Sequence, residues 1–389
     1  MFGDNCYKFN ETLLRFLGVW PYGRTQCERF RAICICILLI SHVIAEFGQL
    51  IIADYSVNTI ITILSDAFQA FLELVVFSAL FFNTKELKRM LEEVINHRQM
   101  LIDSQEIKIL EYYVHQGEKF VVTVIWLLMF LALTFVIIGV LPDIFDFLRP
   151  LNESRTHNLL FMKEYQINIG IQYYFFFYYT LISHVIGTLA STAFISISLS
   201  ITLHCCAILK ICSYQTENFV DNKIIACSNK RNEIVGKIIR IVELHQKAKK
   251  LCKKIMTSFT VFLLVLIVIG ICSFAMNLYR VMNAIKRIHD TVEFLLAICF
   301  FMGYEVFLLT SSFMGQIVIN HADELFNAPY MSFWYKAPVT IQKSLLFIMQ
   351  VSSKQMAMNI GGIYAITMES FTSITSTAIS FMTVFYSLQ

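Results

Sequence analysis

Charged residues and prolines are scarce in this sequence. Only 15% of its 389 residues are charged, whereas a soluble domain carries about 25%. Together with 57% hydrophobic residues, this scarcity excludes an ordinary soluble domain, and the hydrophobicity excludes a disordered chain. The net charge of +3 gives no sign of nucleic-acid binding. No nucleophile, metal-ligand cluster or pair of catalytic acids stands out, so we expect neither an enzyme nor a bound cofactor or metal.

Long stretches without Lys or Arg predict where the chain crosses a membrane, because either residue is costly at the bilayer centre. Each apolar run is long enough to span a hydrocarbon core of roughly 30 Å. We expect seven helices, at residues 32–53, 60–83, 120–141, 170–206, 256–279, 291–319 and 362–387. The sequence therefore predicts an all-α membrane protein in which residues 1–389 form a single seven-helix domain.

Basic residues fall mainly on one side of these helices. Most of the 31 Lys and Arg residues precede the first helix or lie in the second, fourth and sixth loops. The positive-inside rule then places the N-terminus in the cytoplasm and the C-terminus outside the cell. In this topology the long loop between the third and fourth helices is extracellular, and its sequon predicts glycosylation at Asn152.

The second and fourth loops carry apolar residues at helical spacing among their acids and bases, which predicts amphipathic helices. Two interpretations of the basic fourth loop remain open. Its helix ends meet anionic membrane lipid, or the fourth and fifth helices continue below the membrane and pack against neighbours.

The five prolines all lie outside the expected spans. Receptors that couple to G proteins usually kink several helices with proline. This chain also lacks their Asp-Arg-Tyr motif in the third helix and their Asn-Pro-x-x-Tyr motif in the seventh. Seven spans alone therefore do not indicate that class, although a metabotropic chemoreceptor coupled to a G protein remains the alternative function.

The seventh helix is rich in hydroxyl groups. One face, followed at steps of four and three, carries Ser373, Thr377, Ser380, Val384 and Ser387. Small hydroxyl residues in a membrane helix often serve only close helix packing. Alternatively, this face lines a water-filled pathway that is closed by an apolar constriction at Val384 and Leu388. One helix cannot enclose a pore, so the second interpretation requires an oligomer.

The order and spacing of several motifs resemble the insect odorant receptors. The residues that carry the resemblance are Gly18–Tyr22, Phe313–Gln316, Ala328–Tyr335, Ser353–Gln355, Gly361 and Thr367–Phe371. The related gustatory receptors have a Thr-Tyr and a Gln-Phe pair where this chain has Ile363-Tyr364 and Ser370-Phe371. This difference favours the odorant branch.

The resemblance implies a ligand-gated, non-selective cation channel made of four subunits in the plasma membrane of an olfactory dendrite or cilium. The fourth loop lacks the long insertion of the family's co-receptor, so this chain resembles an odorant-tuning subunit that assembles with that co-receptor. The resemblance further implies a pore helix at residues 362–389, with a gate at Val384 and Leu388. Ser387 stands where the co-receptor has a pore glutamine. Residues 205–255 and 320–358 would form a cytoplasmic anchor between subunits, with Ala337–Ser352 as the first half of a broken seventh helix.

The family resemblance also implies a pocket for a small volatile molecule in the outer halves of the second to sixth helices. The positions that the expected spans place at this depth are Phe68, Gln69, Leu72, Phe135, Val136, Gly139, Tyr174, Phe177, Tyr178, Phe274 and Leu278. An apolar cavity with few polar groups suits such a ligand. Ordinary helix packing is the alternative interpretation for each of these residues.

The acidic residues and the histidines within the spans allow two further predictions. Glu73 and Glu305 lie deep within apolar segments, where we expect each acid to make a polar contact between helices. His184 and His204 have no partners at metal-ligand spacing, so we expect both to have structural roles.

Overall fold

The computed structural model describes residues 5–53, 56–101, 103–148, 171–219, 231–286, 291–354 and 356–387. Seven long helices coincide with the seven expected spans, so the predicted helical fold is confirmed. They are α2 (Gln26–Ile52), α3 (Val57–Phe82), α5 (Ser104–Leu148), α7 (Ile171–Glu217), α9 (Arg231–Lys286), α10 (Thr291–Met331) and α12 (Met368–Ser387).

Shorter elements connect these helices. They are α1 (Asn5–Phe16), α4 (Thr84–Gln99), the 3-10 turn Trp334–Lys336, α11 (Val339–Ser352), β1 (Asn359–Ile360) and β2 (Tyr364–Ala365). The helix α11 occupies most of the segment expected to be the first half of a broken seventh helix. Gly361 and Gly362 form the tip of the antiparallel β1–β2 hairpin, with φ of 59° and 73°, a left-handed conformation that glycine adopts without steric cost.

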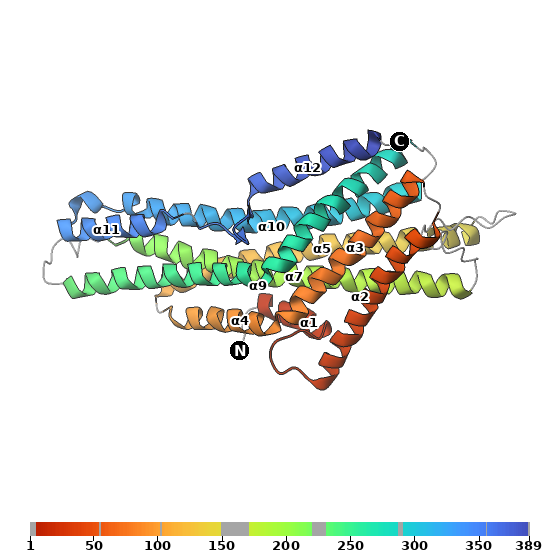
Figure 1. Cartoon of the computed structure of the whole chain (residues 1–389). Coiled ribbons are helices and arrows are strands. Elements are labelled where there is room, and N and C mark those ends of the chain that lie inside the picture. Colours follow the sequence, from red (N-terminus) through yellow and green to blue (C-terminus); the bar gives the residue numbers. More distant parts are fainter. Residues whose placement is uncertain are drawn as a thin grey trace.

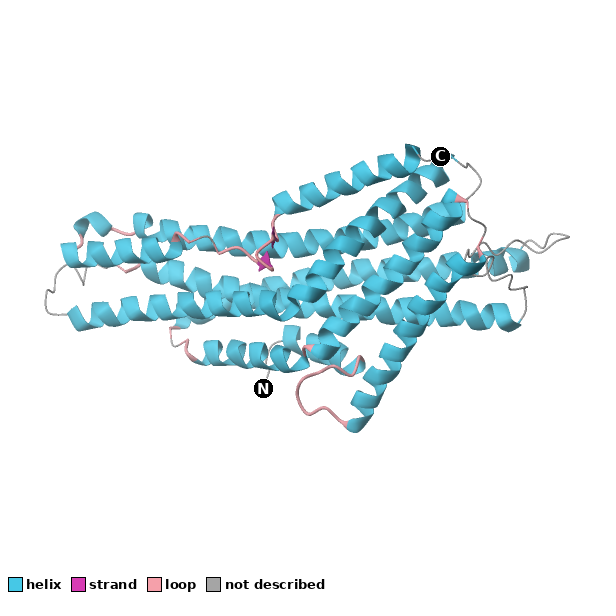
Figure 2. Ribbon diagram, viewed as in Figure 1, coloured by secondary structure: helices cyan, strands magenta, loops and turns pink. Residues whose placement is uncertain are grey.

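The helices form an elongated bundle (Figure 1). At the α11 end the bundle consists mainly of α7, α9, α10 and α11, whereas at the opposite end α2, α3 and α12 splay outwards (Figure 2). The helix α12 packs on the outside of the bundle, against α9 and α10. The hairpin that precedes α12 lies near the middle of the molecule.

Six of the long helices in the described part of the chain are long and apolar enough to cross a membrane. The exception is α12, because its many Ser and Thr residues lower its hydropathy. Several helices also extend beyond the expected spans. Thus α10 continues through Pro329 to Met331, so this proline lies inside a helix although it lies outside the expected span.

The fourth loop is short because the helices on either side of it are long. Helix α7 continues to Glu217, and α9 begins at Arg231. Bases of this α9 extension pair with acids of neighbouring helices: Arg240 Nη2 lies 2.6 Å from Glu106 Oε2, and Lys254 Nζ lies 2.9 Å from Glu93 Oε1. The extended helices therefore pack against their neighbours, as the second interpretation of this basic loop expects.

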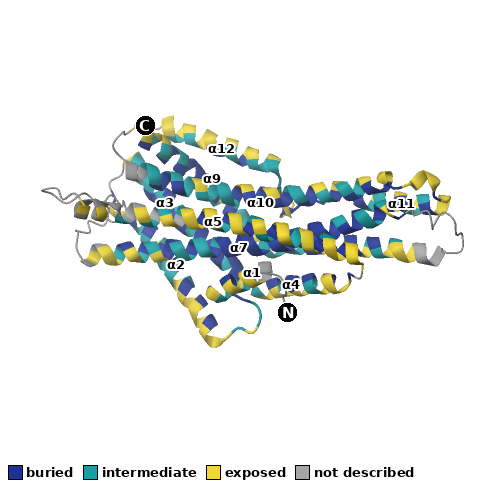
Figure 3. Cartoon of the chain, turned by 180° about the vertical axis from the view of Figure 1, so that it is seen from behind, coloured by how far each residue is buried: buried dark blue, intermediate teal, exposed yellow. Residues whose placement is uncertain are grey.

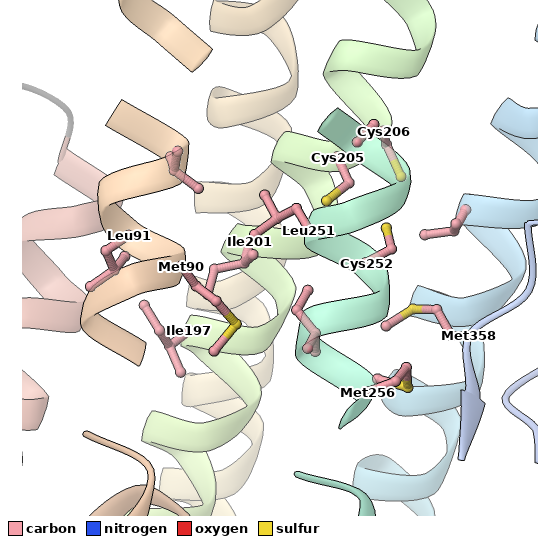
Figure 4. Close-up of a cluster of buried hydrophobic side chains, with 14 of the residues drawn as sticks. Met90, Leu91, Ile197, Ile201, Cys205, Cys206, Leu251, Cys252, Met256 and Met358 are labelled. Carbon is pink, nitrogen blue, oxygen red and sulfur yellow. The ribbon is translucent and has the colours of Figure 1, made fainter. Parts of the chain in front are cut away.

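An apolar core joins α4, α7 and α9 (Figure 4). Met90 and Leu91 of α4 are fully buried, as are Cys205 and Cys206 of α7 and Leu251 of α9. Protein interiors are in general packed about as densely as organic crystals, which makes such cores rigid. Buried residues, which are dark blue in Figure 3, lie along much of α7, whereas α12 is mostly exposed.

Candidate functional site

A cavity of about 160 Å³ lies inside the bundle. An engineered cavity of about 150 Å³ in another protein binds benzene, so this space suits a small organic molecule. Its wall comes from α3, α5, α7, α9, α10, the β1–β2 hairpin and α12. Most of this wall is apolar and includes Leu72, Leu128, Leu263, Leu266 and Phe307.

One part of the cavity wall is polar and joins α3 to α7. Glu73 Oε1 lies 3.2 Å from His184 Nδ1 and 3.4 Å from Gln69 Nε2. The His42 ring of α2 meets the His184 ring edge-on, with 4.8 Å between the ring centres. The expected interhelical contact of Glu73 is therefore present, and its partner is His184.

Gly187 makes space for this polar group. A Cβ atom at this position would overlap the carboxyl group of Glu73. A glycine within a helix destabilises it by roughly 0.5–1 kcal/mol relative to alanine. Here the missing side chain allows α7 to approach the acid of α3 directly.

The hairpin and the start of α12 close another side of the cavity. Ile360, Tyr364 and Ile366 of the hairpin segment contribute to the wall, as does Ile374 of α12. A molecule in the cavity therefore lies beside the segment that leads into α12.

Two residues of α10 hold this segment in place. A Cβ atom at Gly315 would overlap the carbonyl oxygen of Ile366, so the absence of a side chain lets the two backbones meet. The Oε1 atom of Gln316 accepts a hydrogen bond from the backbone N–H of Met368 at 3.4 Å, which satisfies a donor at the first turn of α12. The Gly-Gln pair thus ties α10 to the entrance of α12.

Two of the eleven predicted pocket residues, Gln69 and Leu72, line the cavity. Among the others, Phe177 and Phe274 are buried outside its lining, Tyr174 and Tyr178 are exposed, and the half-buried residues are Phe68, Val136 and Leu278. The side chains of Phe135 and Gly139, like Asn152 and Leu388, lie outside the described residues.

The cavity lies on the helices that the sequence indicates, but closer to the α11 end. On α7 its lining begins at His184, seven residues after Phe177, and on α9 it ends at Ile267, seven residues before Phe274. Seven residues of helix span about 10 Å. The run of aromatic residues in α7 therefore lies farther from the α11 end than this cavity does. At the level of the cavity, the sequence of α7 has a weaker signal, which consists of His184 and the hydroxyl residues Thr188 and Ser191.

The helix α12 has one face on the bundle and one face exposed. Ile374 and Ala378 are buried, and Met382 and Phe385 pack against a cluster around Tyr279. The five described residues of the predicted pore all belong to the exposed part of α12, namely Ser373, Thr377, Ser380, Val384 and Ser387. The two faces follow directly from the helical period of 3.6 residues.

Three of the four hydroxyl protons of this exposed face are already used within α12. Thr377 donates to the carbonyl of Ser373 at 2.8 Å, Ser380 to that of Ser376 at 2.9 Å, and Ser387 to that of Val384 at 2.8 Å. A hydroxyl oxygen that donates its proton keeps its acceptor lone pairs. The exposed face therefore offers acceptor oxygens, which suit water or a cation.

The chain matches the sequence model of the family described as 7tm Odorant receptor over residues 60–379. None of the curated protein sequences with which it was compared matches it. The fold is similar to two structures of the insect olfactory receptor OR5 from Machilis hrabei, one of them in complex with eugenol. Both have a TM-score of 0.77 and 10% sequence identity, and each alignment covers 98% of this chain.

The alignments also cover 97% of the eugenol complex chain and 98% of the other. The likeness therefore extends over the whole seven-helix bundle. The family match spans most of the chain and includes six of the seven long helices in whole or in part, and α2 precedes it. The chain belongs to the odorant receptor family, whose insect members are ligand-gated cation channels and not enzymes.

Proposed function

We propose that this chain is the odorant-binding subunit of a heteromeric, non-selective cation channel that a small volatile molecule opens. The observation that carries the proposal is the position of the cavity. Its wall includes both the helices that would recognise a ligand and the hairpin and α12, which would move when the channel opens.

Ligand binding would act on α12 through Ile374, Tyr364 and Ile366, which all line the cavity. A ligand shifts a conformational equilibrium only by its difference in affinity for the two states. If this segment moves between the closed and the open state, a molecule that contacts it binds the two states with different affinities. The hydrogen bond from Met368 to Gln316 and the close contact at Gly315 then belong to the closed arrangement.

The exposed hydroxyl face of α12 supports a shared pore. Four copies of such a face around a central axis would give a water-filled path, closed by an apolar ring at Val384 and Leu388. The partners in this proposal are subunits of the odorant co-receptor, in a tetramer at the plasma membrane of a sensory dendrite or cilium. The N-terminus lies in the cytoplasm, as the distribution of basic residues indicates.

The structural neighbour supports the kind of ligand. OR5 from Machilis hrabei has been solved in complex with eugenol, a small organic molecule. The cavity of about 160 Å³ in this chain suits a ligand of similar type.

Excised membrane patches test this proposal. Cells that express the chain with the co-receptor should give a fast current to a volatile agonist after excision, when GTP and soluble messengers are absent. Cells with either subunit alone should not give that agonist response. Loss of the response on excision, while an agonist of the co-receptor still opens channels, would instead favour coupling through a G protein.

A further inference from the structure

Besides the phenol groups of Tyr304 and Tyr364, the cavity wall carries four aliphatic hydroxyl side chains on two helices. Thr188 and Ser191 lie three residues apart on α7, and Ser311 and Ser312 are adjacent on α10. Residues three apart on a helix share one face, so the two α7 hydroxyls point the same way. Together they form a polar zone in a wall that is otherwise largely apolar.

The two adjacent serines of α10 differ in their hydrogen bonds. Ser311 donates to the carbonyl of Phe307 in its own helix at 2.8 Å. Ser312 is only 2% exposed, and its hydroxyl makes no hydrogen bond to another residue that the structure describes. A buried hydroxyl without a partner is unfavourable unless something else binds it. Ser312 therefore has a proton to donate into the cavity.

The rest of the wall determines what kind of molecule this proton meets. Leu128, Leu266 and Leu308 surround the space with hydrocarbon. Of the other polar groups in the wall, Glu73 Oε1 is bonded to His184 at 3.2 Å, whereas Glu73 Oε2 and the Tyr364 hydroxyl have no partner among the described residues. A matching ligand is thus mostly hydrocarbon, with an oxygen that accepts a hydrogen bond.

We propose that the cavity selects small volatile molecules with an oxygen function, and that Ser312, the most deeply buried of the four aliphatic hydroxyls in the wall, donates a hydrogen bond to that oxygen. Aldehydes, ketones and alcohols share this chemistry, because the oxygen of each accepts hydrogen bonds. The inference rests on the proposed function and names the ligand class for the same site. Ser312 then determines specificity, whereas the leucines provide affinity that does not depend on the oxygen.

Binding of three probes to the full chain in lipid nanodiscs tests the inference, with thermal unfolding followed as a function of probe concentration. The probes are octanal, octanol and octane, which share one carbon chain. We expect the wild type to bind the two oxygenated probes more tightly than octane. Ser312→Ala should weaken their binding by about 3- to 10-fold, the usual effect of one neutral hydrogen bond, and leave octane unchanged.

Ser311→Ala is the matched control, since it removes a hydroxyl of equal size, one residue away, that is already bonded within its helix. It should change the affinity for each probe by less than about twofold. Equal effects of the two variants would overturn the role of Ser312, as would an equal loss of octane binding in Ser312→Ala. Failure of both oxygenated probes to bind the wild type would overturn the ligand class.

A cavity-filling variant separates this inference from the proposed function. Leu266→Phe adds a ring to the apolar wall and should abolish binding of the oxygenated probes. If the wild type binds all three probes equally and this variant loses them, the cavity is the binding site and only the choice of an oxygen function is wrong. If binding persists in Leu266→Phe, the molecules bind elsewhere, and the cavity loses its role in both proposals.

Discussion

Helices α7 and α12 have similar chemistry and opposite surroundings. Both mix large apolar residues with many serines and threonines. Nearly all of the central apolar segment of α7 is buried within the bundle, whereas Ile374 and Ala378 are the only buried residues that the structure describes in α12. Hydroxyl content alone therefore does not decide whether a helix packs or lines a surface.

The hydrogen bonds of the two helices explain what their hydroxyls do. On α7, Ser196 donates to Asn10 Oδ1, and Ser200 accepts from Asn10 Nδ2 at 3.0 Å, so these hydroxyls fasten the N-terminal helix α1 to the bundle. Among the described residues, no hydroxyl of α12 bonds to another helix. The two interpretations of a hydroxyl-rich membrane helix thus both occur in this chain, packing in α7 and an exposed polar face in α12.

The largest effect is expected from Ser200→Leu on α7. The larger side chain overpacks a buried contact, at about 1–3 kcal/mol, and leaves Asn10 with an unsatisfied buried amide, at about 1–3 kcal/mol more. Thermal unfolding of the purified chain should show the loss of stability, and less protein should reach the cell surface. Wild-type stability in this variant would show that α1 is not fastened through Ser200.

The same exchange on α12 should leave stability unchanged and alter the current. Ser380→Leu places an apolar side chain on the exposed face, where substitutions usually change stability by less than about 0.5 kcal/mol. It removes one acceptor oxygen from the proposed pore. We expect a lower single-channel conductance with normal unfolding. Destabilisation as large as that of Ser200→Leu would mean that this face is a packing surface.

The substitution Val384→Ala tests whether the gate of the proposed pore lies at Val384. A smaller side chain at the constriction would widen the apolar ring and raise the current without agonist. Because the other subunits keep their own residues, the increase should be partial. Recordings from matched cells that express the variant or the wild type measure it. Identical basal current and identical pore block would place the constriction elsewhere on α12.

The smallest effect is expected from Thr375→Val, on the side of α12 that faces the bundle. The Thr375 hydroxyl is buried without a partner among the described residues. Replacing such a group by an isosteric apolar one is nearly neutral or stabilising, by up to about 1 kcal/mol. Unfolding of the isolated chain should show this, and the tetramer should assemble normally. Poor assembly would show that Thr375 bonds to a neighbouring subunit.

The sequence was a good guide to the helices and a partial guide to the cavity. Each of the seven helices produces its own signal, since an apolar run without Lys or Arg is a local property. The cavity depends on which residues of five helices meet at one level, and this level follows from packing. Gln69 and Leu72 lie at that level, but the aromatic residues Tyr174 and Tyr178 do not.

Other features are not decided by local signals. The fourth loop allows two interpretations, and only the structure shows that α7 and α9 extend far beyond the bilayer length, because the extensions are stabilised by neighbours such as Glu106 and Glu93. The sequence motif containing Gly315 and Gln316 marks the family. Only the structure shows that its glycine admits the backbone of Ile366 and its glutamine binds the first turn of α12.

By itself the sequence determined the class of protein, the seven helices and the two-faced character of α12. Burial of apolar groups and the cost of charges in a bilayer act on each segment separately, so local composition is sufficient for these properties. Only the tertiary structure decided where the cavity lies, which acid pairs with His184, and which hydroxyls remain without a partner. These features depend on contacts between segments distant in sequence, and such contacts are fixed when the helices pack together.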